Sequence, residues 1–300
     1  MVMAKTVFFI LLLLTFASGP AAAEPKVLVL QSVSVAPYEQ VVKGFEQASG
    51  STVQRLFISD LKEKEIFQSV RLLRPDMVLA VGRDALSLAR QIKTVPIVYC
   101  MVLNPLSLLT DEKNIRGVSM NPSPEKQFSE LIRLLPGVRN INLLYDPEKS
   151  GVFVQRLHEA LAKMDVRLTA GAVHHSADVP RRLNELKGKN GIYWMLPDTT
   201  VITTETLETI FLFSLEATMP ILTFADKYLE LGAALSIGIN PYDIGSQAGE
   251  LAQKILSGNG VENSTYLDAR KAVVTINEKV ASKLGITVDQ KVLENNRGRH

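Results

Sequence analysis

The feature that most constrains the fold is a regular alternation of strand-length apolar runs with amphipathic helical segments. Apolar runs at 27–30 and 77–81 are each followed by a polar loop and by a segment whose apolar residues fall at helical spacing. Continuous apolar runs of this length are typical of parallel strands that are covered on both faces. Strands that alternate with helices in this way predict right-handed βαβ units around a parallel sheet.

The alternation is interrupted once and then restarts, which predicts two lobes. A short strand at 115–120 runs into Asn121-Pro122-Ser123-Pro124, and the two prolines disfavour both helix and ladder hydrogen bonding. We therefore expect an α/β protein of two Rossmann-like lobes with parallel sheets, joined by a hinge. The expected ranges are 24–120 with about 230–262 for the first lobe, 121–229 with about 263–290 for the second, and 291–300 for a tail.

The amino terminus has the pattern of a secretory signal peptide. Lys5 supplies a positive charge, residues 6–16 form an almost unbroken apolar run, and residues 21–23 are three alanines. This pattern predicts a signal peptide over residues 1–23, with an uncleaved anchor as the alternative. The run is shorter than the about 20 apolar residues that span a bilayer. Because no cysteine follows it, we expect a periplasmic or secreted protein that is soluble after cleavage and carries no lipid anchor.

Composition argues against two classes of protein. The 300 residues carry a formal net charge of +2 and show no basic stripe, which disfavours nucleic acid as a partner. The single cysteine, Cys100, cannot form an internal disulfide, so the protein does not belong among disulfide-stapled secreted domains. The length suits two domains of ordinary size with hydrophobic cores of their own.

No pattern of catalytic or metal-binding residues emerges. His174 and His175 are adjacent, and neighbouring side chains on a strand point to opposite faces, so the two do not readily share one ion. The segment 117–121 lacks the second glycine of a nucleophile elbow, and no phosphate-loop or Rossmann glycine pattern is present. We therefore expect no enzyme activity, no metal and no cofactor.

Short motifs follow one another along the mature chain in a characteristic order. They are Val81-Gly82 with Asp84-Ala85, Val95-Pro96-Ile97-Val98 running to Asn104-Pro105, Gly117-Val118-Ser119, Leu134-Leu135-Pro136, Leu143-Leu144-Tyr145-Asp146-Pro147, Leu196-Pro197-Asp198, Met219-Pro220-Ile221, Gly232-Ala233-Ala234-Leu235, Asp243-Ile244-Gly245, Lys254-Ile255-Leu256-Ser257-Gly258 and Ile276-Asn277. In this order the chain resembles the substrate-binding proteins of ABC transporters, in the group of type I periplasmic binding protein fold that includes aromatic amino-acid binders.

The resemblance implies an exported protein that captures a small polar molecule between its lobes and delivers it to the permease of an ABC importer. An amino acid is the ligand that the family favours, with aromatic ones as first candidates. Two ligand-facing loops depart from the usual pattern of the family. Gly82-Arg83 stands where Gly-Thr is common, and Asn104-Pro105 stands where Asp-Pro is common. The identity of the ligand is therefore not carried over from the resemblance.

Candidate binding residues follow the predicted strands, because ligands of open parallel sheets sit beyond the carboxyl ends of the strands. Helix N-termini there offer free N–H groups to anions, and two facing lobes can close around a ligand by hinge motion. The candidates in the first lobe are Ser32, Ser34, Tyr38, Arg83, Asp84 and Asn104, and those in the second are Asp146, Asp198, Thr199, Asp226 and Tyr228.

Several candidates have a structural alternative. Arg83 is expected to clasp a ligand carboxylate, or else to be a surface cation. Tyr38 stacks on a ligand or packs in its helix, and Asp84 is equally suited to cap a helix. Asp198 is the first choice in the second lobe, where it is expected to pair with a ligand ammonium; helix capping or turn formation is its alternative. Asn104 can both donate and accept hydrogen bonds.

Three classes of function remain to be separated. The first is a solute receptor for an ABC importer, and the second is an exported sensory module that reports ligand occupancy to a membrane signalling protein. Both would use the same pocket, so the residues do not distinguish them. A secreted enzyme is disfavoured by the missing catalytic constellation.

Overall fold

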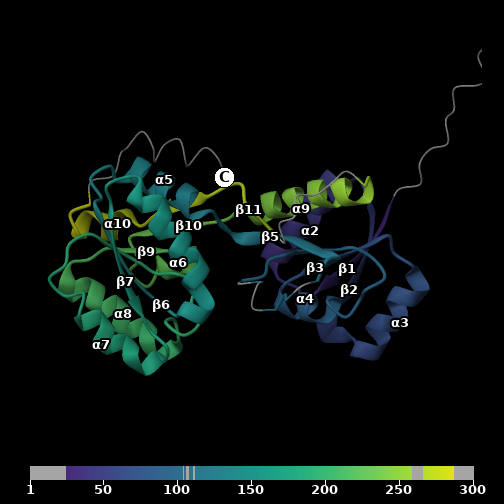
Figure 1. Ribbon diagram of the computed structural model, residues 1–300, viewed down its shortest axis with the longest axis horizontal. Coiled ribbons are helices and arrows are strands. Elements are labelled where there is room, and N and C mark those ends of the chain that lie inside the picture. Colours follow the sequence, from purple (N-terminus) through teal and green to yellow (C-terminus); the bar gives the residue numbers. More distant parts are fainter. Residues whose placement is uncertain (1–24, 104, 106–107, 111, 259–265, 287–300) are drawn as a thin grey trace, which may run out of the picture.

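The computed structural model describes residues 25–103, 105, 108–110, 112–258 and 266–286. They form two α/β lobes that lie side by side in Figure 1, each built around a six-stranded sheet. This architecture confirms the predicted fold class. Within the described residues, no helix combines the length and the apolar character needed to cross a membrane.

Lobe 1 is the lobe whose sheet has the strand order β2-β1-β3-β4-β5-β11, with every neighbouring pair parallel. Its strands are β1 (Lys26–Gln31), β2 (Thr52–Phe57), β3 (Met77–Val81), β4 (Ile97–Cys100), β5 (Ile115–Pro122) and β11 (Tyr266–Ala269). Its helices are α2 (Ala36–Ser49), α3 (Glu63–Leu73), α4 (Arg83–Ala89) and α9 (Pro241–Leu256), with a 3₁₀ turn, η1 (Ile58–Asp60).

Strand β1 shows why the apolar runs of lobe 1 are continuous. Val27 and Val29 pack against α2 and α9, whereas Leu28 and Leu30 pack on the opposite face against α3 and α4. Successive side chains of a strand point to opposite faces, so a strand that is covered on both sides needs apolar residues at every position.

Helices α2 and α9 are in backbone contact, which fixes the position of α9. A Cβ atom added to Gly245 would lie 1.9 Å from the carbonyl oxygen of Val41, and one added to Gly44 would lie 2.1 Å from that of Tyr242. Only glycine permits so close an approach of two backbones. Helix α9 is therefore held rigidly in lobe 1.

Lobe 2 has the sheet order β7-β6-β8-β9-β10-β12, and its edge strand β12 is antiparallel while the other pairs are parallel. Helices α5, α6 and α10 cover one face and α7 and α8 the other. The strands are β6 (Asn140–Tyr145), β7 (Arg167–Ala172), β8 (Ile192–Trp194), β9 (Ile221–Thr223), β10 (Leu235–Gly238) and β12 (Val273–Ile276). The helices are α5 (Pro124–Leu134), α6 (Pro147–Ala162), α7 (Val179–Asn184), α8 (Thr204–Ala217) and α10 (Glu278–Lys283), with 3₁₀ turns η3 (Ser176–Asp178) and η4 (Asp226–Tyr228).

The chain crosses between the lobes three times, after β5, after β10 and after β11. The expected ranges differ from the observed ones at two of these crossings. Segment 230–262 was expected in lobe 1, but β10 pairs with β9 and β12 in lobe 2. Segment 263–290 was expected in lobe 2, but β11 pairs with β5 in lobe 1. The apolar run at β10 indicates a strand without saying which sheet it joins. The β11 segment is not an apolar run and was not predicted as a strand, so the sequence did not determine these crossings.

Candidate ligand-binding site

A pocket lies between the lobes, beside the first and third crossings. It contains about 850 Å³ of space, including solvent at its mouth. Lobe 1 contributes β5, β11 and the loop after β4, and lobe 2 contributes α5, α6 and the ends of β8 and β9. Its described lining mixes apolar and aromatic residues with seven polar or charged ones, which are Ser119, Asn121, Gln127, Lys149, Ser150, Arg156 and Asp268. Small-molecule sites likewise combine apolar walls with polar groups that orient the ligand.

The apolar wall of the pocket contains four aromatic rings. Trp194, at the end of β8, packs edge to face against Phe153 of α6, with ring centroids 6.2 Å apart and an interplanar angle of 78°. Phe224 follows β9, and Tyr266 begins β11 on the other lobe. Rings placed on both sides of a cleft can contact an apolar ligand group from two directions.

An ion pair joins the lobes across this pocket. Arg156 of α6 donates from Nη2 to Asp268 Oδ2 of β11 at 2.7 Å, and Nη1 lies 3.4 Å from Oδ1. The hydrogen bond from Arg156 to Asp268 raises the pKa of the guanidinium above its usual value. Glu125 of α5 adds a second carboxylate, with its Oε2 3.7 Å from Nη2 of Arg156. The Arg156 and Asp268 side chains are 33% and 28% exposed, so solvent and solutes reach the pair.

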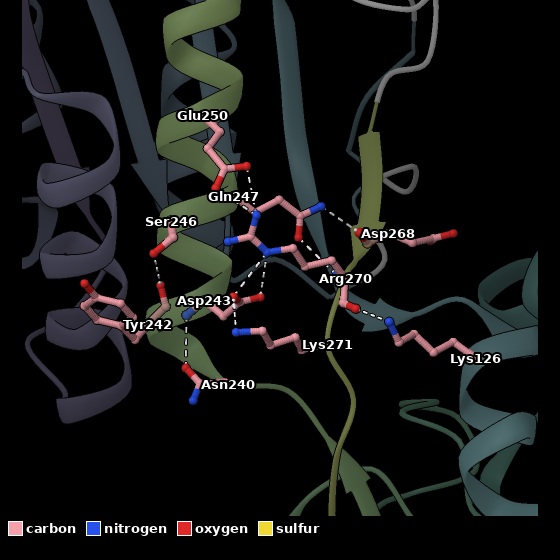
Figure 2. Close-up of polar contacts among 10 residues, drawn as sticks. All are labelled: Lys126, Asn240, Tyr242, Asp243, Ser246, Gln247, Glu250, Asp268, Arg270 and Lys271. Atoms are coloured by element: carbon pink, nitrogen blue, oxygen red, sulfur yellow. Dashed lines mark hydrogen bonds and ion pairs between the residues drawn. The ribbon is translucent and has the colours of Figure 1, made fainter. Parts of the chain in front are cut away.

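A buried glutamine of α9 holds the third crossing in place. Figure 2 shows the Gln247 side chain beside β11, where Nε2 donates to the carbonyl oxygen of Asp268 at 2.8 Å and Oε1 accepts from the amide of Arg270 at 3.1 Å. Gln127 of α5 has a similar role at the first crossing. Its Nε2 donates to the carbonyl oxygen of Pro122 at 2.8 Å. Side-chain amides thus satisfy backbone groups that leave the sheets.

Charged side chains tie the same crossing to lobe 1. Arg270 donates from Nε to both carboxylate oxygens of Asp243 at 3.1 Å, and from Nη1 to Glu250 at 2.8 Å. Burial raises the pKa of Asp243, but the hydrogen bonds from Arg270 and Lys271 outweigh it and the pKa is lowered. Lys126 of lobe 2 donates to the carbonyl oxygen of Arg270 (Figure 2). The third crossing is therefore anchored on α9 and contacted from lobe 2.

Comparison with known proteins identifies the family. Residues 33–298 match the model of the ABC transporter substrate-binding protein family. The chain belongs to this family. Its members bind substrates and are not enzymes.

Similar proteins agree with this assignment. A tyrosine-binding protein of Clostridioides difficile (strain R20291) is 23% identical over 220 residues, which is 70% of this chain and 63% of that relative, so less than two thirds of the relative's length is matched. A ligand-free, open substrate-binding protein with adhesive properties from Clostridium difficile is 21% identical, with a TM-score of 0.68 and coverage of 89% and 96% of the two chains. An ABC domain in complex with L-Trp from Streptococcus pneumoniae is 22% identical, with a TM-score of 0.58 and coverage of 91% and 98%.

The predicted site residues of lobe 1 that the structure describes lie at the carboxyl end of its sheet, outside the pocket lining. Ser32 is buried, and its Oγ accepts from the amide of Ala85 at 3.0 Å. Tyr38 is half-buried in the core of lobe 1, and burial raises the pKa of its hydroxyl, with Cys100 and Asp84 adding to the shift. Ser34, Arg83 and Asp84 are exposed, and Asn104 lies outside the described residues. Ligand binding by these side chains remains a prediction.

Asp198, the first choice in the second lobe, forms a turn. Its side chain is 1% exposed. Oδ2 accepts from the amide of Asp146 at 2.8 Å and from Ser150 Oγ at 2.7 Å. Oδ1 accepts from the amides of Thr200 and Val201 at 3.0 and 3.3 Å. A carboxylate has about four lone-pair sites, and here all are used within the lobe. These bonds correspond to the structural alternative for Asp198 rather than to pairing with a ligand.

Asp146 belongs to the same network. It caps α6 by accepting from the amide of Glu148 at 3.0 Å, and its Oδ2 accepts from Thr200 Oγ1 at 2.6 Å. Burial raises the pKa of Asp146, but the Thr200 hydroxyl and the Glu148 amide, with Lys149 and His174 nearby, lower it below the usual aspartate range. This carboxylate therefore stabilises the start of α6 in its ionised form.

The remaining candidates of lobe 2 also contact the protein itself. Thr199 is exposed and accepts from Lys149 Nζ at 2.9 Å. Asp226 accepts from Ser236 and from Thr275 Oγ1, the latter at 3.2 Å. Tyr228 is buried and packs edge to face on Phe224, with centroids 5.3 Å apart. Through Phe224, this last contact reaches the pocket.

Sequence reasoning missed the side chains that line the pocket. None of the predicted residues that the structure describes is among them. Trp194 packs in the core of lobe 2 and also faces the pocket. Arg156 lies in the middle of a helix, and Asp268 lies in a segment that was expected in the other lobe and not predicted as a strand, so no strand-end rule selects them. Groups of three or more metal-binding side chains are absent from the described part of the chain.

Proposed function

We propose that this protein captures a free amino acid with an aromatic side chain in the pocket between its lobes and delivers it to an ABC importer. One observation carries the proposal. The pocket combines aromatic rings from both lobes with an ion pair of Arg156 and Asp268 that bridges them. An aromatic amino acid has the matching chemistry, since it joins an apolar ring to one positive and one negative group.

The two-lobed architecture supports capture by closure. A ligand that contacts both lobes binds the closed arrangement more tightly than the open one, so it shifts the population toward closure. The pocket is lined from both sides, which is the geometry that such closure requires. A permease can then distinguish the loaded protein from the empty one by the relative position of the lobes.

The relatives support the choice of an aromatic ligand. One similar protein is a tyrosine-binding protein, and one similar structure contains L-Trp. Their identities of 23% and 22% leave the ligand of this chain to be measured. Tyrosine, tryptophan and phenylalanine are therefore the first ligands to test.

Export is part of the proposal. Within residues 1–23 a positive charge is followed by an apolar run and then by three alanines, which is the order found in secretory signal peptides. These residues lie outside the described part of the chain. Amino-terminal sequencing of the protein from the cell exterior or periplasm tests it. The expected first residue is Glu24, and recovery of the intact amino terminus in the cytoplasm contradicts export.

Thermal unfolding and fluorescence test the proposed ligand class. At 100 times Kd a ligand adds about 2.7 kcal/mol of stability, which raises Tm by several degrees for a domain of this size. Trp194 is the only tryptophan of the sequence and lines the pocket, so bound phenylalanine or tyrosine should also shift its emission. If none of the twenty amino acids changes Tm or emission, the proposal fails.

A matched pair of variants locates the site. Val152 and Leu215 are apolar side chains with 58% and 54% exposure, but only Val152 is among the described residues that line the pocket. Val152→Asp should weaken amino-acid binding at least about tenfold, because closure would bury an unpaired charge beside the ligand. Leu215→Asp on α8 should leave binding unchanged. Equal effects of the two variants would place the site elsewhere.

A further inference from the structure

The Arg156–Asp268 pair lies where the two lobes meet and where a ligand would enter. Arg156 comes from α6 of lobe 2 and Asp268 from β11 of lobe 1, and both line the aromatic pocket. Because each side chain is about one-third exposed, the pair is open to exchange with solutes. Partly exposed ion pairs contribute little to stability, roughly 0–1 kcal/mol, so separating this one costs the fold little.

We propose that these two side chains hold each other in the empty pocket and separate to bind a zwitterion. In the loaded protein Arg156 binds the α-carboxylate of an amino acid, and Asp268 binds its α-ammonium. This inference rests on the proposed function and identifies the residues that select its ligand class. No covalent bond changes, and no proton moves. One protein–protein ion pair is replaced by two protein–ligand ion pairs.

Charge balance explains why a zwitterion fits best. The net charge of the pair is zero. A ligand with one positive and one negative group therefore gives both Arg156 and Asp268 a new partner. A monoanion would occupy Arg156 and leave the carboxylate of Asp268 without its partner. A monocation would occupy Asp268 and leave Arg156 with only its longer 3.7 Å contact to Glu125. Leaving one member of such a pair without a partner in a desolvated pocket is costly. The site therefore discriminates against amines and simple carboxylic acids with the same side chain.

The composition of the pocket gives the ammonium one anionic partner. Asp268 is the sole acidic side chain among the described residues that line the pocket, and the cationic ones are Arg156 and Lys149. Lys149 already donates to Thr199 Oγ1. Two aspartates of lobe 2 lie nearby and are engaged within that lobe. Asp198 accepts four internal hydrogen bonds, and Asp146 accepts from Glu148 and Thr200.

Other residues hold Arg156 and Asp268 in position, so each side chain stays close to the pocket after the ion pair between them is broken. The Gln247 amide holds the backbone of Asp268 and Arg270 against α9, as Figure 2 shows. On the other lobe Glu125 lies 3.7 Å from Arg156 and keeps a carboxylate near the guanidinium. Preorganised side chains of this kind lose less entropy on binding. Ligand entry thus changes partners without moving the backbone of β11.

The decisive experiment removes one charge from the protein and the matching charge from the ligand. Binding of L-tyrosine, of tyramine, which lacks the carboxylate, and of 3-(4-hydroxyphenyl)propionate, which lacks the ammonium, is measured by calorimetry on the full chain. Where the wild-type protein prefers L-tryptophan, tryptamine and indole-3-propionate replace the analogues. Analogues too weak for direct titration are compared by displacement of the bound amino acid.

The pair predicts a crossed pattern of losses. Arg156→Gln should weaken binding of the amino acid about 10-fold to 100-fold and leave binding of the amine unchanged or tighter, because it removes the cation that competes for Asp268. Asp268→Asn should weaken binding of the amino acid by a similar factor and leave binding of the deaminated acid unchanged or tighter, because it removes the carboxylate that competes for Arg156. Arg55→Gln is the control, because Arg55 forms an ion pair of similar exposure with Glu39 inside lobe 1. It should change none of the affinities.

The outcomes separate the two proposals. If the wild-type protein binds no amino acid, the proposed function fails and this inference with it. A second outcome is that the wild-type protein binds an amino acid while each variant changes the affinity for all three ligands equally, or changes none of the affinities. In that case the Arg156–Asp268 pair does not bind the two charged groups of the ligand, although the proposed function stands. Thermal unfolding checks that the variants fold, and Arg156→Met, which also removes the charge, serves where Arg156→Gln does not fold.

Discussion

Asp198 and Asp268 lie on facing lobes near the same cleft, yet their surroundings differ. Asp198 is buried and accepts four hydrogen bonds from residues of its own lobe. Asp268 is partly exposed and pairs with Arg156 from the opposite lobe. A carboxylate whose oxygens are all used locally stabilises the fold. A carboxylate whose partner comes from the other lobe can exchange that partner when the lobes move. The lobe from which the hydrogen-bond partners of a carboxylate come is therefore a better guide to its function than its position near a cleft.

The largest effect on stability is expected from Asp198→Ala. The substitution leaves the amides of Asp146, Thr200 and Val201 without their acceptor, and buried groups without partners cost about 1–3 kcal/mol each. We expect a loss of about 3–5 kcal/mol, measured by urea unfolding. Thr199→Ala changes the exposed neighbouring residue and should alter stability by less than about 0.5 kcal/mol. A stable Asp198→Ala protein that has lost ligand binding would restore the ligand-pairing role of Asp198.

A smaller effect, with a distinctive pH dependence, is expected from Thr200→Val. The variant keeps the shape of the side chain but loses the 2.6 Å hydrogen bond to Asp146, worth about 2 kcal/mol for an ionised acceptor. Because the pKa of Asp146 is lowered in the folded state, its contribution is complete above the unfolded pKa of about 4 and is lost as pH falls through the folded pKa. Unfolding free energies of variant and wild type should therefore differ most at neutral pH, and the difference should shrink as pH falls from about 4 through the lowered pKa of folded Asp146. A difference that is constant with pH would contradict this account.

The smallest effect on stability is expected from Asp268→Asn, in contrast to its large effect on binding. Partly exposed ion pairs are worth roughly 0–1 kcal/mol, so the free energy of unfolding should fall by less than about 1 kcal/mol. Added salt should reduce even this difference. Urea unfolding at low and high ionic strength measures both. A loss as large as that of Asp198→Ala would show that Asp268 is structural too.

The comparison also shows what the sequence could predict. Continuous apolar runs such as 27–30 identified strands covered on both faces, because period and composition depend only on local burial. The sheet to which β10 belongs was not predictable, because a strand can pair in either sheet. The β11 segment was not predicted as a strand, because its four residues are not an apolar run. Arg156 and Asp268 are 112 residues apart in sequence and meet across the third crossing, which the sequence placed elsewhere. The polar residues after strands, such as Asp146 and Asp198, were predictable in position but not in partner.

A crystal structure of the protein with its bound amino acid tests the central claim most directly. The account predicts density for the ligand between the lobes, with its ring against Phe153 and Trp194 and its charged groups between the side chains of Arg156 and Asp268. Density beside Tyr38 and Arg83, with the Arg156–Asp268 pair still closed, would contradict it.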